Sequence, residues 1–287
     1  MKKEKISHQS ERVTSESPKS SINVTKSSIF ERLVPAMLVI TIGLAFMVGV
    51  LWQKVENLGK NGVAGTGTTA QQQAAPAPIK VELSQIKDLF SKDVVKFGNA
   101  DSKLIFVEAS DPSCPYCHIA GGLNSALNKQ VGPQFTLVKD GGTYVAPVIE
   151  MKKLVDEGKA SFVWLYFNGH GNGELATKAM YCAYEKGKFW EAHDLLMTET
   201  AYDFINNTVK NDMAQSQKMV DFLKSANIPD LKTCLDSDKY ADRLASDMSL
   251  AASLGVSGTP GFFVNENNFA GAYSFKDMES LVTSALK

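Results

Sequence analysis

Two cysteines, Cys114 and Cys117, lie where a predicted strand turns into a predicted helix, and this placement restricts the fold more than any other feature. Before them, residues 104–109 are apolar and rich in β-branched and aromatic side chains, which is typical of a buried strand. After them, residues 119–130 have a helical pattern, and Pro115 fits the first position of a helix. The pattern predicts an α/β fold with both cysteines at a strand-to-helix turn.

This position favours redox chemistry at the two thiols. A thiol at the start of a helix faces unpaired backbone N–H groups and the positive end of the helix dipole. Both stabilise the thiolate, which is the form of cysteine that attacks disulfides. Because only two residues separate Cys114 from Cys117, the pair is predicted to alternate between a dithiol and a disulfide.

The first 80 residues differ in character from the rest of the chain. Residues 1–32 are rich in Ser, Lys and Glu and are predicted to be a disordered cytoplasmic tail. Residues 33–52 contain no charge, and a helix of this length spans the roughly 30 Å hydrocarbon core of a bilayer. Basic residues are more frequent before this segment than after it, which predicts a cytoplasmic N-terminus. Residues 53–80, rich in Gly, Ala, Gln and Pro, are predicted to be a flexible linker.

The apolar segment is longer than a normal signal-peptide core, which favours an uncleaved signal anchor over a cleaved signal peptide. We therefore expect a single-pass protein of the bacterial cytoplasmic membrane, with residues 81–287 in the periplasm or extracellular space. Disulfides persist in such compartments. Cys182 and Cys234 are expected to form a structural bridge there, and the alternative is two separate buried thiols.

The remainder, 81–287, reads as one domain with an α/β core interrupted by helices. The strand before the cysteines and a second strand at 161–167, joined by a helical crossover, suggest a parallel βαβ unit. From 174 to about 252 the periodicity is helical throughout. The other expected elements are a helix at 81–90, strands at 94–97 and 135–138, a helix at 148–157, strands at 261–265 and 269–272, and a last helix from Ser274.

Four features make residues 91–287 similar to the thioredoxin superfamily, and within it to the DsbA-like thiol-disulfide oxidoreductases. They are the strand–Cys-Pro-Tyr-Cys–helix unit, the pair Thr259-Pro260 directly before the apolar run 261–264, the helical block with its run 187–196, and Glu108 six residues before Cys114. The resemblance implies a thioredoxin-like fold with an inserted helical domain, here preceded by one transmembrane helix.

The resemblance also implies a mechanism of thiol–disulfide exchange. Cys114 would be the exposed attacking sulfur, and Cys117 would resolve the mixed disulfide. Glu108 would be a buried acid that carries a proton to or from Cys117; the alternative is an ordinary surface glutamate on a strand edge. Thr259 and Pro260 would be joined by a cis peptide bond and lie against the cysteines.

Three further residues belong to the predicted active-site loop. Pro115 and Tyr116 would shape this loop and tune the reduction potential of the cysteine pair. The same dipeptide resembles that of glutaredoxins, so it does not set the direction of electron flow. His118 either helps to stabilise a thiolate or is a solvated helix residue. His193, in contrast, is predicted to pack structurally within the insertion.

The resemblance favours an oxidase that introduces disulfides into reduced secreted or periplasmic proteins and is reoxidised by an unidentified membrane redox partner. A reductase or an isomerase of the same fold is the alternative. We expect a monomer that needs no cofactor and no metal. The formal net charge of −1 argues against nucleic acid as a partner.

Two other classes of protein fit parts of the pattern. Residues 114–118 also spell C-x-x-C-H, the attachment signature of c-type haem, which would make the chain an anchored electron carrier. A Thr-Pro pair before a strand has no evident purpose in such a protein. Four cysteines also suggest a zinc site, but zinc sites usually use two close pairs, and Cys182 and Cys234 are far apart.

Overall fold

The structure is a computed structural model, and it describes residues 80–287. The predicted tail (1–32), the predicted transmembrane segment (33–52) and the predicted linker up to residue 79 lie outside the described residues. Within residues 80–287, no helix combines the length and the apolar character that crossing a bilayer requires.

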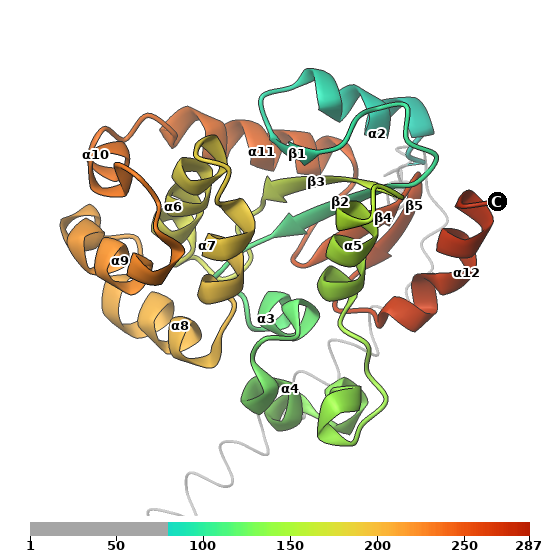
Figure 1. Cartoon of the computed structure of the whole chain (residues 1–287), viewed down its shortest axis with the longest axis horizontal. Helices are drawn as coiled ribbons and strands as arrows, with labels where there is room; N and C mark the ends of the chain where they lie inside the picture. Colours follow the sequence, from blue (N-terminus) through green and yellow to red (C-terminus); the bar gives the residue numbers. More distant parts are fainter. Residues whose placement is uncertain (1–79) are drawn as a thin grey trace, which may run out of the picture. The chain divides into compact units, whose positions relative to one another are not determined.

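A five-stranded sheet forms the centre of the described domain, with the strands in the order β1-β3-β2-β4-β5 (Figure 1). Their bounds are β1 Val95–Phe97, β2 Ile105–Ser110, β3 Ser161–Tyr166, β4 Gly261–Val264 and β5 Asn267–Ala270. Strands β2 and β3 are parallel, and the helix α5 (Pro147–Asp156) lies between them in sequence, so the predicted βαβ unit is confirmed. The other strand pairs are antiparallel.

Helices cover both faces of the sheet, which explains why every residue of β2 and β3 is buried. On one face, Ile105 and Val107 pack with residues of α2 (Leu83–Asp88) and α11 (Ala241–Ser253). On the other face, Phe106 belongs to a larger core shared with the insertion. The side chains of β2 alternate between these faces, so Glu108 points to the same face as Phe106.

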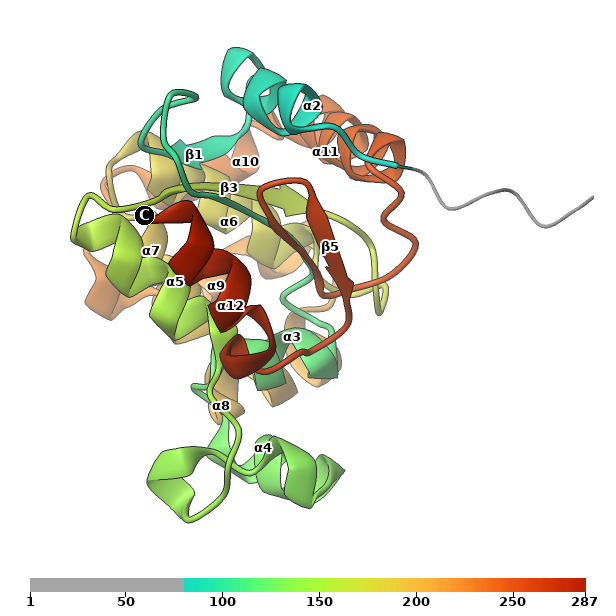
Figure 2. The same cartoon turned by 90° about the vertical axis from the view of Figure 1, so that its right-hand side faces the viewer.

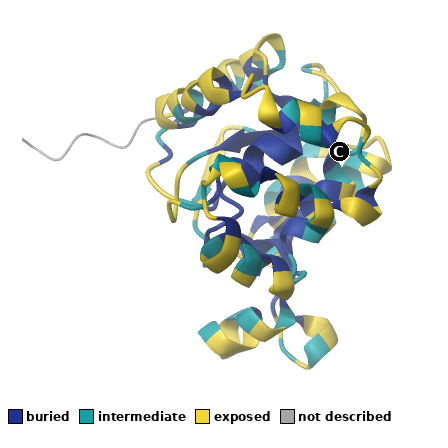
Figure 3. Cartoon of the chain, turned by 90° about the vertical axis from the view of Figure 1, so that its left-hand side faces the viewer, coloured by how far each residue is buried: buried dark blue, intermediate teal, exposed yellow. Residues whose placement is uncertain are grey.

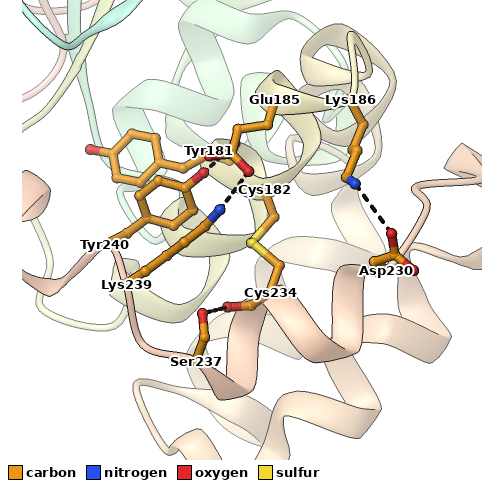
Figure 4. Close-up of a disulfide and its surroundings, with 9 residues drawn as sticks. All are labelled: Tyr181, Cys182, Glu185, Lys186, Asp230, Cys234, Ser237, Lys239 and Tyr240. Carbon is orange, nitrogen blue, oxygen red and sulfur yellow. Dashed lines mark hydrogen bonds and ion pairs between the residues drawn. A yellow bond between two sulfur atoms is a disulfide. The ribbon is translucent and has the colours of Figure 1, made fainter.

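The predicted helical block is present between β3 and β4. It consists of α6 Glu174–Glu185, α7 Phe189–Leu196, α8 Glu199–Asp203, a π-helical segment Phe204–Val209, α9 Ser216–Phe222, α10 Leu231–Asp236 and α11. The expected disulfide between Cys182 and Cys234 is formed, and it joins α6 to α10 (Figure 4). The last helix is α12, Phe275–Ala285.

The helical pattern predicted over 119–130 is present, but it is divided between two helices. Helix α3 (Pro115–Gly121) ends because Gly122 adopts a left-handed conformation with φ of 69°, which glycine tolerates best. A new helix, α4 (Ser125–Val131), begins at Asn124, whose side chain accepts a hydrogen bond from the backbone N–H of Leu127.

The strand expected at 135–138 is also wrong. Two short 3₁₀ turns, Pro133–Phe135 and Val138–Asp140, occupy this region, and Leu137 forms one isolated bridge with Tyr144. With α4 they form a segment that projects from the domain (Figure 2). Most of this segment is exposed or half-buried, whereas strands β2, β3 and β4 are buried (Figure 3).

Candidate active site

The two cysteines lie where β2 runs into α3. Cys114 is the N-cap of α3, and Pro115 occupies a first-turn position that needs no N–H donor. The carbonyl of Cys114 accepts hydrogen bonds from the N–H groups of Cys117 and His118 at 3.1 and 3.3 Å. Both sulfurs are free thiols in this structure. The helix start that the sequence predicts for this pair is confirmed.

The surroundings of the two thiols shift their pKa values in opposite directions. A hydrogen bond from Cys117 is the main cause that lowers the pKa of Cys114 to about 6, with further contributions from Thr259 and from the N–H groups at the helix start. Burial is the main cause that raises the pKa of Cys117 well above its ordinary value, and the neighbouring Cys114 adds to it. Cys114 therefore carries the thiolate, and Cys117 holds the proton.

Thr259 and Pro260 lie beside Cys114, as the resemblance implies. Their peptide bond is cis, and the Sγ of Cys114 lies 3.5 Å from the carbonyl oxygen of Thr259, to which it donates a hydrogen bond when it is protonated. The same two residues line a cavity of about 230 Å³ that also includes 255–258. Cys114 is only 4 % exposed, so the exposure predicted for its sulfur is wrong, while its role as the attacking sulfur stays a prediction. The backbone of Thr259 covers one side of it.

Tyr116 is the exposed member of the active-site loop, with 44 % of its surface accessible. Its ring packs edge-on against Phe135 of the projecting segment, with the two ring centroids 6.0 Å apart. Phe135 packs in the same way against Tyr144, with a centroid distance of 5.7 Å. A second cavity, of about 340 Å³, is lined by Phe135, Tyr144 and Tyr273. The projecting segment therefore extends the apolar surface next to Cys114.

Glu108 is buried on the central strand β2, so the alternative of a surface glutamate on a strand edge is wrong. Burial raises its pKa, which the charge of His193 and the hydroxyl of Ser110 lower in part. Ser110 lies two residues closer to the thiols and also lowers the pKa of Cys117. Glu108 thus lies on the same side of the sheet as Cys117, with Ser110 between them in sequence.

His118 is completely buried, so it neither is solvated nor faces a substrate. Its Nε2 lies 2.8 Å from the carbonyl oxygen of Pro112, and its Nδ1 lies 3.1 Å from that of Met197 at the end of α7. Burial lowers its pKa to about 4. The interpretation of His118 as a solvated helix residue is therefore wrong, and its role in stabilising a thiolate stays a prediction. The ring ties α3 to the insertion.

The haem and zinc alternatives do not fit these residues. A haem iron needs an accessible histidine nitrogen, but both ring nitrogens of His118 face backbone carbonyls. A zinc site made of four thiolates is excluded, because Cys182 and Cys234 are bonded to each other. Within residues 80–287, no three His, Cys, Asp or Glu side chains are grouped so as to hold a metal ion.

Sequence reasoning missed a carboxylate that organises the loops around the thiols. Asp111, completely buried, accepts hydrogen bonds from the N–H and hydroxyl of Ser113 through one oxygen. Its other oxygen accepts hydrogen bonds from the N–H groups of Gly169 and His170, both at 2.9 Å. A side chain at Gly169 would overlap Thr259, since an added Cβ would lie 1.7 Å from its Oγ1.

The insertion reaches the same loops through Asn206. The amide of Asn206 donates to the carbonyl of Ser113 at 3.1 Å and accepts a hydrogen bond from Asn172. Asn206 lies in the π-helical segment, a geometry often found at functional sites. The sequence signal for this part of the site is the run 168–173, which is rich in Gly and Asn and follows β3 directly. Because β2 and β3 are parallel, their carboxyl ends meet at one edge of the sheet.

Comparisons with known proteins agree with this architecture. A family model described as Thioredoxin matches residues 148–284, a range that begins after the two cysteines. A Wolbachia pipientis alpha-DsbA1 variant of known structure has a TM-score of 0.51 and 15 % identity, and the match covers 72 % of this chain and 96 % of that one.

Two curated relatives are similar in sequence. A Rickettsia felis protein, provisionally named a protein-disulfide oxidoreductase, is 23 % identical over 223 residues, which make up 76 % of this chain and 68 % of that protein. The Na⁺/H⁺ antiporter NhaA 3 of Salinispora tropica is 28 % identical over 196 residues, 66 % of this chain. This chain spans only 24 % of the length of that antiporter.

Residues 80–287 have a thioredoxin-like fold, since the Thioredoxin family model matches within them and the alpha-DsbA1 variant shares their fold.

Proposed function

We propose that the protein is a thiol-disulfide oxidoreductase that introduces disulfides into reduced secreted or periplasmic proteins. The single observation that carries this proposal is the opposite pKa shift of two adjacent thiols at a helix start, with Cys114 near 6 and Cys117 well above its ordinary value. The helix start supplies N–H groups to the Cys114 thiolate, and Thr259 lies beside it.

The reaction begins with the disulfide between Cys114 and Cys117. A substrate thiolate attacks the sulfur of Cys114, a mixed disulfide forms, and Cys117 leaves as a thiolate that takes up one proton. A second substrate thiolate then attacks the substrate sulfur of the mixed disulfide, and Cys114 leaves as a thiolate. The substrate loses two electrons, which the cysteine pair gains. Glu108, the buried acid of β2, exchanges the proton of Cys117.

The direction of electron flow follows from the stability of the reduced form. With a pKa of about 6, Cys114 is about nine-tenths thiolate at pH 7. A stabilised thiolate favours the dithiol over the disulfide, and this makes the disulfide a better oxidant. The lowered pKa of Cys114 supports our choice of the oxidase over the reductase or isomerase alternatives.

The reduction potential of the Cys114–Cys117 pair tests this direction. After equilibration with glutathione mixtures and alkylation of Cys114 and Cys117, we expect a potential more positive than about −250 mV. A value near that of thioredoxin, about −270 mV, or below would reject the oxidase and favour a reductase. Peptide mapping keeps Cys182 and Cys234 out of the measurement.

We also propose a location for the protein in the cell. The charge-free segment 33–52 and the basic residues before it support a single-pass anchor in the bacterial cytoplasmic membrane, with the redox domain outside. A membrane redox partner would then reoxidise the cysteine pair, and the domain would act as a monomer. Protease added to the outside of spheroplasts should cut residues 81–287, and protection of this domain would contradict the topology.

A further inference from the structure

Beneath α3, one face of the sheet holds several buried polar atoms that lack partners among the described residues. They are both carboxylate oxygens of Glu108, the hydroxyl of Ser110 and the Nε2 of His193. An unpaired buried polar atom destabilises the folded state. A group of such atoms at one place therefore needs an explanation other than packing.

These atoms form a series that leads away from Cys117. Ser110 lowers the pKa of both Cys117 and Glu108, although it makes no full hydrogen bond with either in this arrangement. Trp164 pairs with Glu108 across the parallel strands and contacts Phe189, on which the His193 ring stacks, so α7 places this imidazole over the same face of the sheet as the carboxylate. The charge of His193 also lowers the pKa of Glu108. Each step connects groups that can give and take a proton.

His193 is held firmly in this place. Its ring stacks on Phe189 with a centroid distance of 5.9 Å, and it makes a T-shaped contact with Trp190 with a centroid distance of 5.2 Å. Its Nδ1 lies 3.0 Å from a carboxylate oxygen of Asp194, which leaves Nε2 as the nitrogen without a partner in the described domain. The carboxylate contact favours a proton on Nδ1, so Nε2 is available to accept one.

The far side of His193 borders a cavity that opens between α3, α5 and α7. The cavity measures about 200 Å³, and its lining includes Gly121, Val148, Lys152, His193 and Asp194. His193 is only 1 % exposed, yet it belongs both to this lining and to the layer that holds Glu108. It therefore stands between the solvent side and the buried carboxylate.

We propose that His193 is a proton-transfer residue that connects Glu108, and through it Cys117, with solvent in the α3–α5–α7 cavity. When the dithiol is oxidised, Cys117 gives its proton to Glu108 with Ser110 as the intermediate hydroxyl. Glu108 passes the proton to Nε2 of His193, and the ring gives up its Nδ1 proton to Asp194, which lines the cavity. Reduction of the disulfide reverses each step, so one proton leaves and one returns per cycle, and the two electrons pass between the cysteine pair and its disulfide or thiol partner.

The charged groups that face His193 are distributed over four elements. Asp194 belongs to α7 itself, Lys152 comes from α5 and lies over the ring of Trp190, and Glu108 comes from β2. His118 of α3 also lies within electrostatic reach, since the charge of His193 lowers the pKa of His118.

This inference rests on the proposed exchange chemistry, so the test separates the two reaction steps. Reduced full-length protein is mixed with oxidised glutathione, and the mixed disulfide at Cys114 is measured first. Its conversion to the Cys114–Cys117 disulfide is then followed, because this step requires Cys117 to lose its proton. We expect His193→Ala to slow this second step about 10²-fold at neutral pH and to leave the first step unchanged.

Added imidazole distinguishes proton transfer from a structural effect. Imidazole is small enough for the cavity and the space left by the missing ring, so it should restore the second step in His193→Ala in proportion to its concentration. His193→Gln, the matched control, fills that space with a side chain that carries no proton and should remain slow with imidazole. Thr177→Val removes a buried hydroxyl of α6 and should match the unchanged protein.

Two results would overturn the inference. One is a second step that runs at the unchanged rate in His193→Ala at every pH. The other is a slow second step that imidazole fails to accelerate. If instead the unchanged protein forms no mixed disulfide at Cys114, the proposed function itself fails.

Discussion

The Cys114→Ser variant is expected to form no mixed disulfide, whereas Cys117→Ser is expected to accumulate one. A serine hydroxyl does not attack a disulfide at neutral pH, so exchange should fall to the uncatalysed background. In Cys117→Ser the Cys114 thiolate still attacks, but no neighbouring thiol resolves the product. Mass spectrometry after reaction with a small disulfide measures both outcomes, and the two variants serve as controls for each other.

The assignment of roles depends on this asymmetry between the two variants. It follows from the pKa near 6 of Cys114 and the raised pKa of Cys117. Equal trapping through both cysteines, or trapping through Cys117 alone, would show that the thiols have been assigned to the wrong steps.

The Cys182→Ala/Cys234→Ala variant is expected to lose about 4 kcal/mol of unfolding free energy. The bridge joins residues separated by 52 positions, and closing a loop of this size removes about that much chain entropy from the unfolded state. It holds α10 against α6, between the ion pairs Lys186–Asp230 and Lys239–Glu185 (Figure 4). Guanidinium unfolding without reductant, followed by circular dichroism, measures the loss.

The ion pairs beside the bridge supply the control. Lys186→Ala removes a contact of 3.2 Å between partly exposed side chains, and such pairs contribute about 0–1 kcal/mol. A double cysteine variant as stable as the unchanged protein would show that packing alone holds α10. The exchange rate of Cys114 should change little, because the bridge lies in the insertion and contributes no atom to the site.

The sequence was sufficient for elements whose pattern is local. Three such elements are the strand β2, the start of α3 and the strand β3. Each is indicated by residues that are adjacent in sequence: the apolar run of β2, Pro115 after Cys114, and the β-like run of β3. The disulfide followed from its expected compartment and from the helical pattern around both cysteines. The break between α3 and α4 was missed because Gly122 is needed for a contact made far along the chain. A Cβ at this position would lie 2.4 Å from the Cβ of Ala146.

The site was harder to derive where burial decides a residue's role. His118 follows Cys117 directly, but its position on α3 turns it into the core instead of toward the thiols. Asp111 gave no signal, because its hydrogen-bond partners Gly169 and His170 become neighbours only when β2 and β3 align. The thiols themselves were found because a helix start acts on residues adjacent in sequence.

The thiolate of Cys114 is the claim on which the mechanism depends, and its titration in the full-length, reduced protein tests it most directly. The alkylation rate of Cys114 follows the thiolate fraction, so it should rise as pH increases through about 6 and level off above pH 7. Peptide mapping assigns the reaction to Cys114, and Cys117 should react negligibly over this range because its pKa is raised. A rate that keeps rising to pH 9, as for an ordinary thiol, would contradict the account.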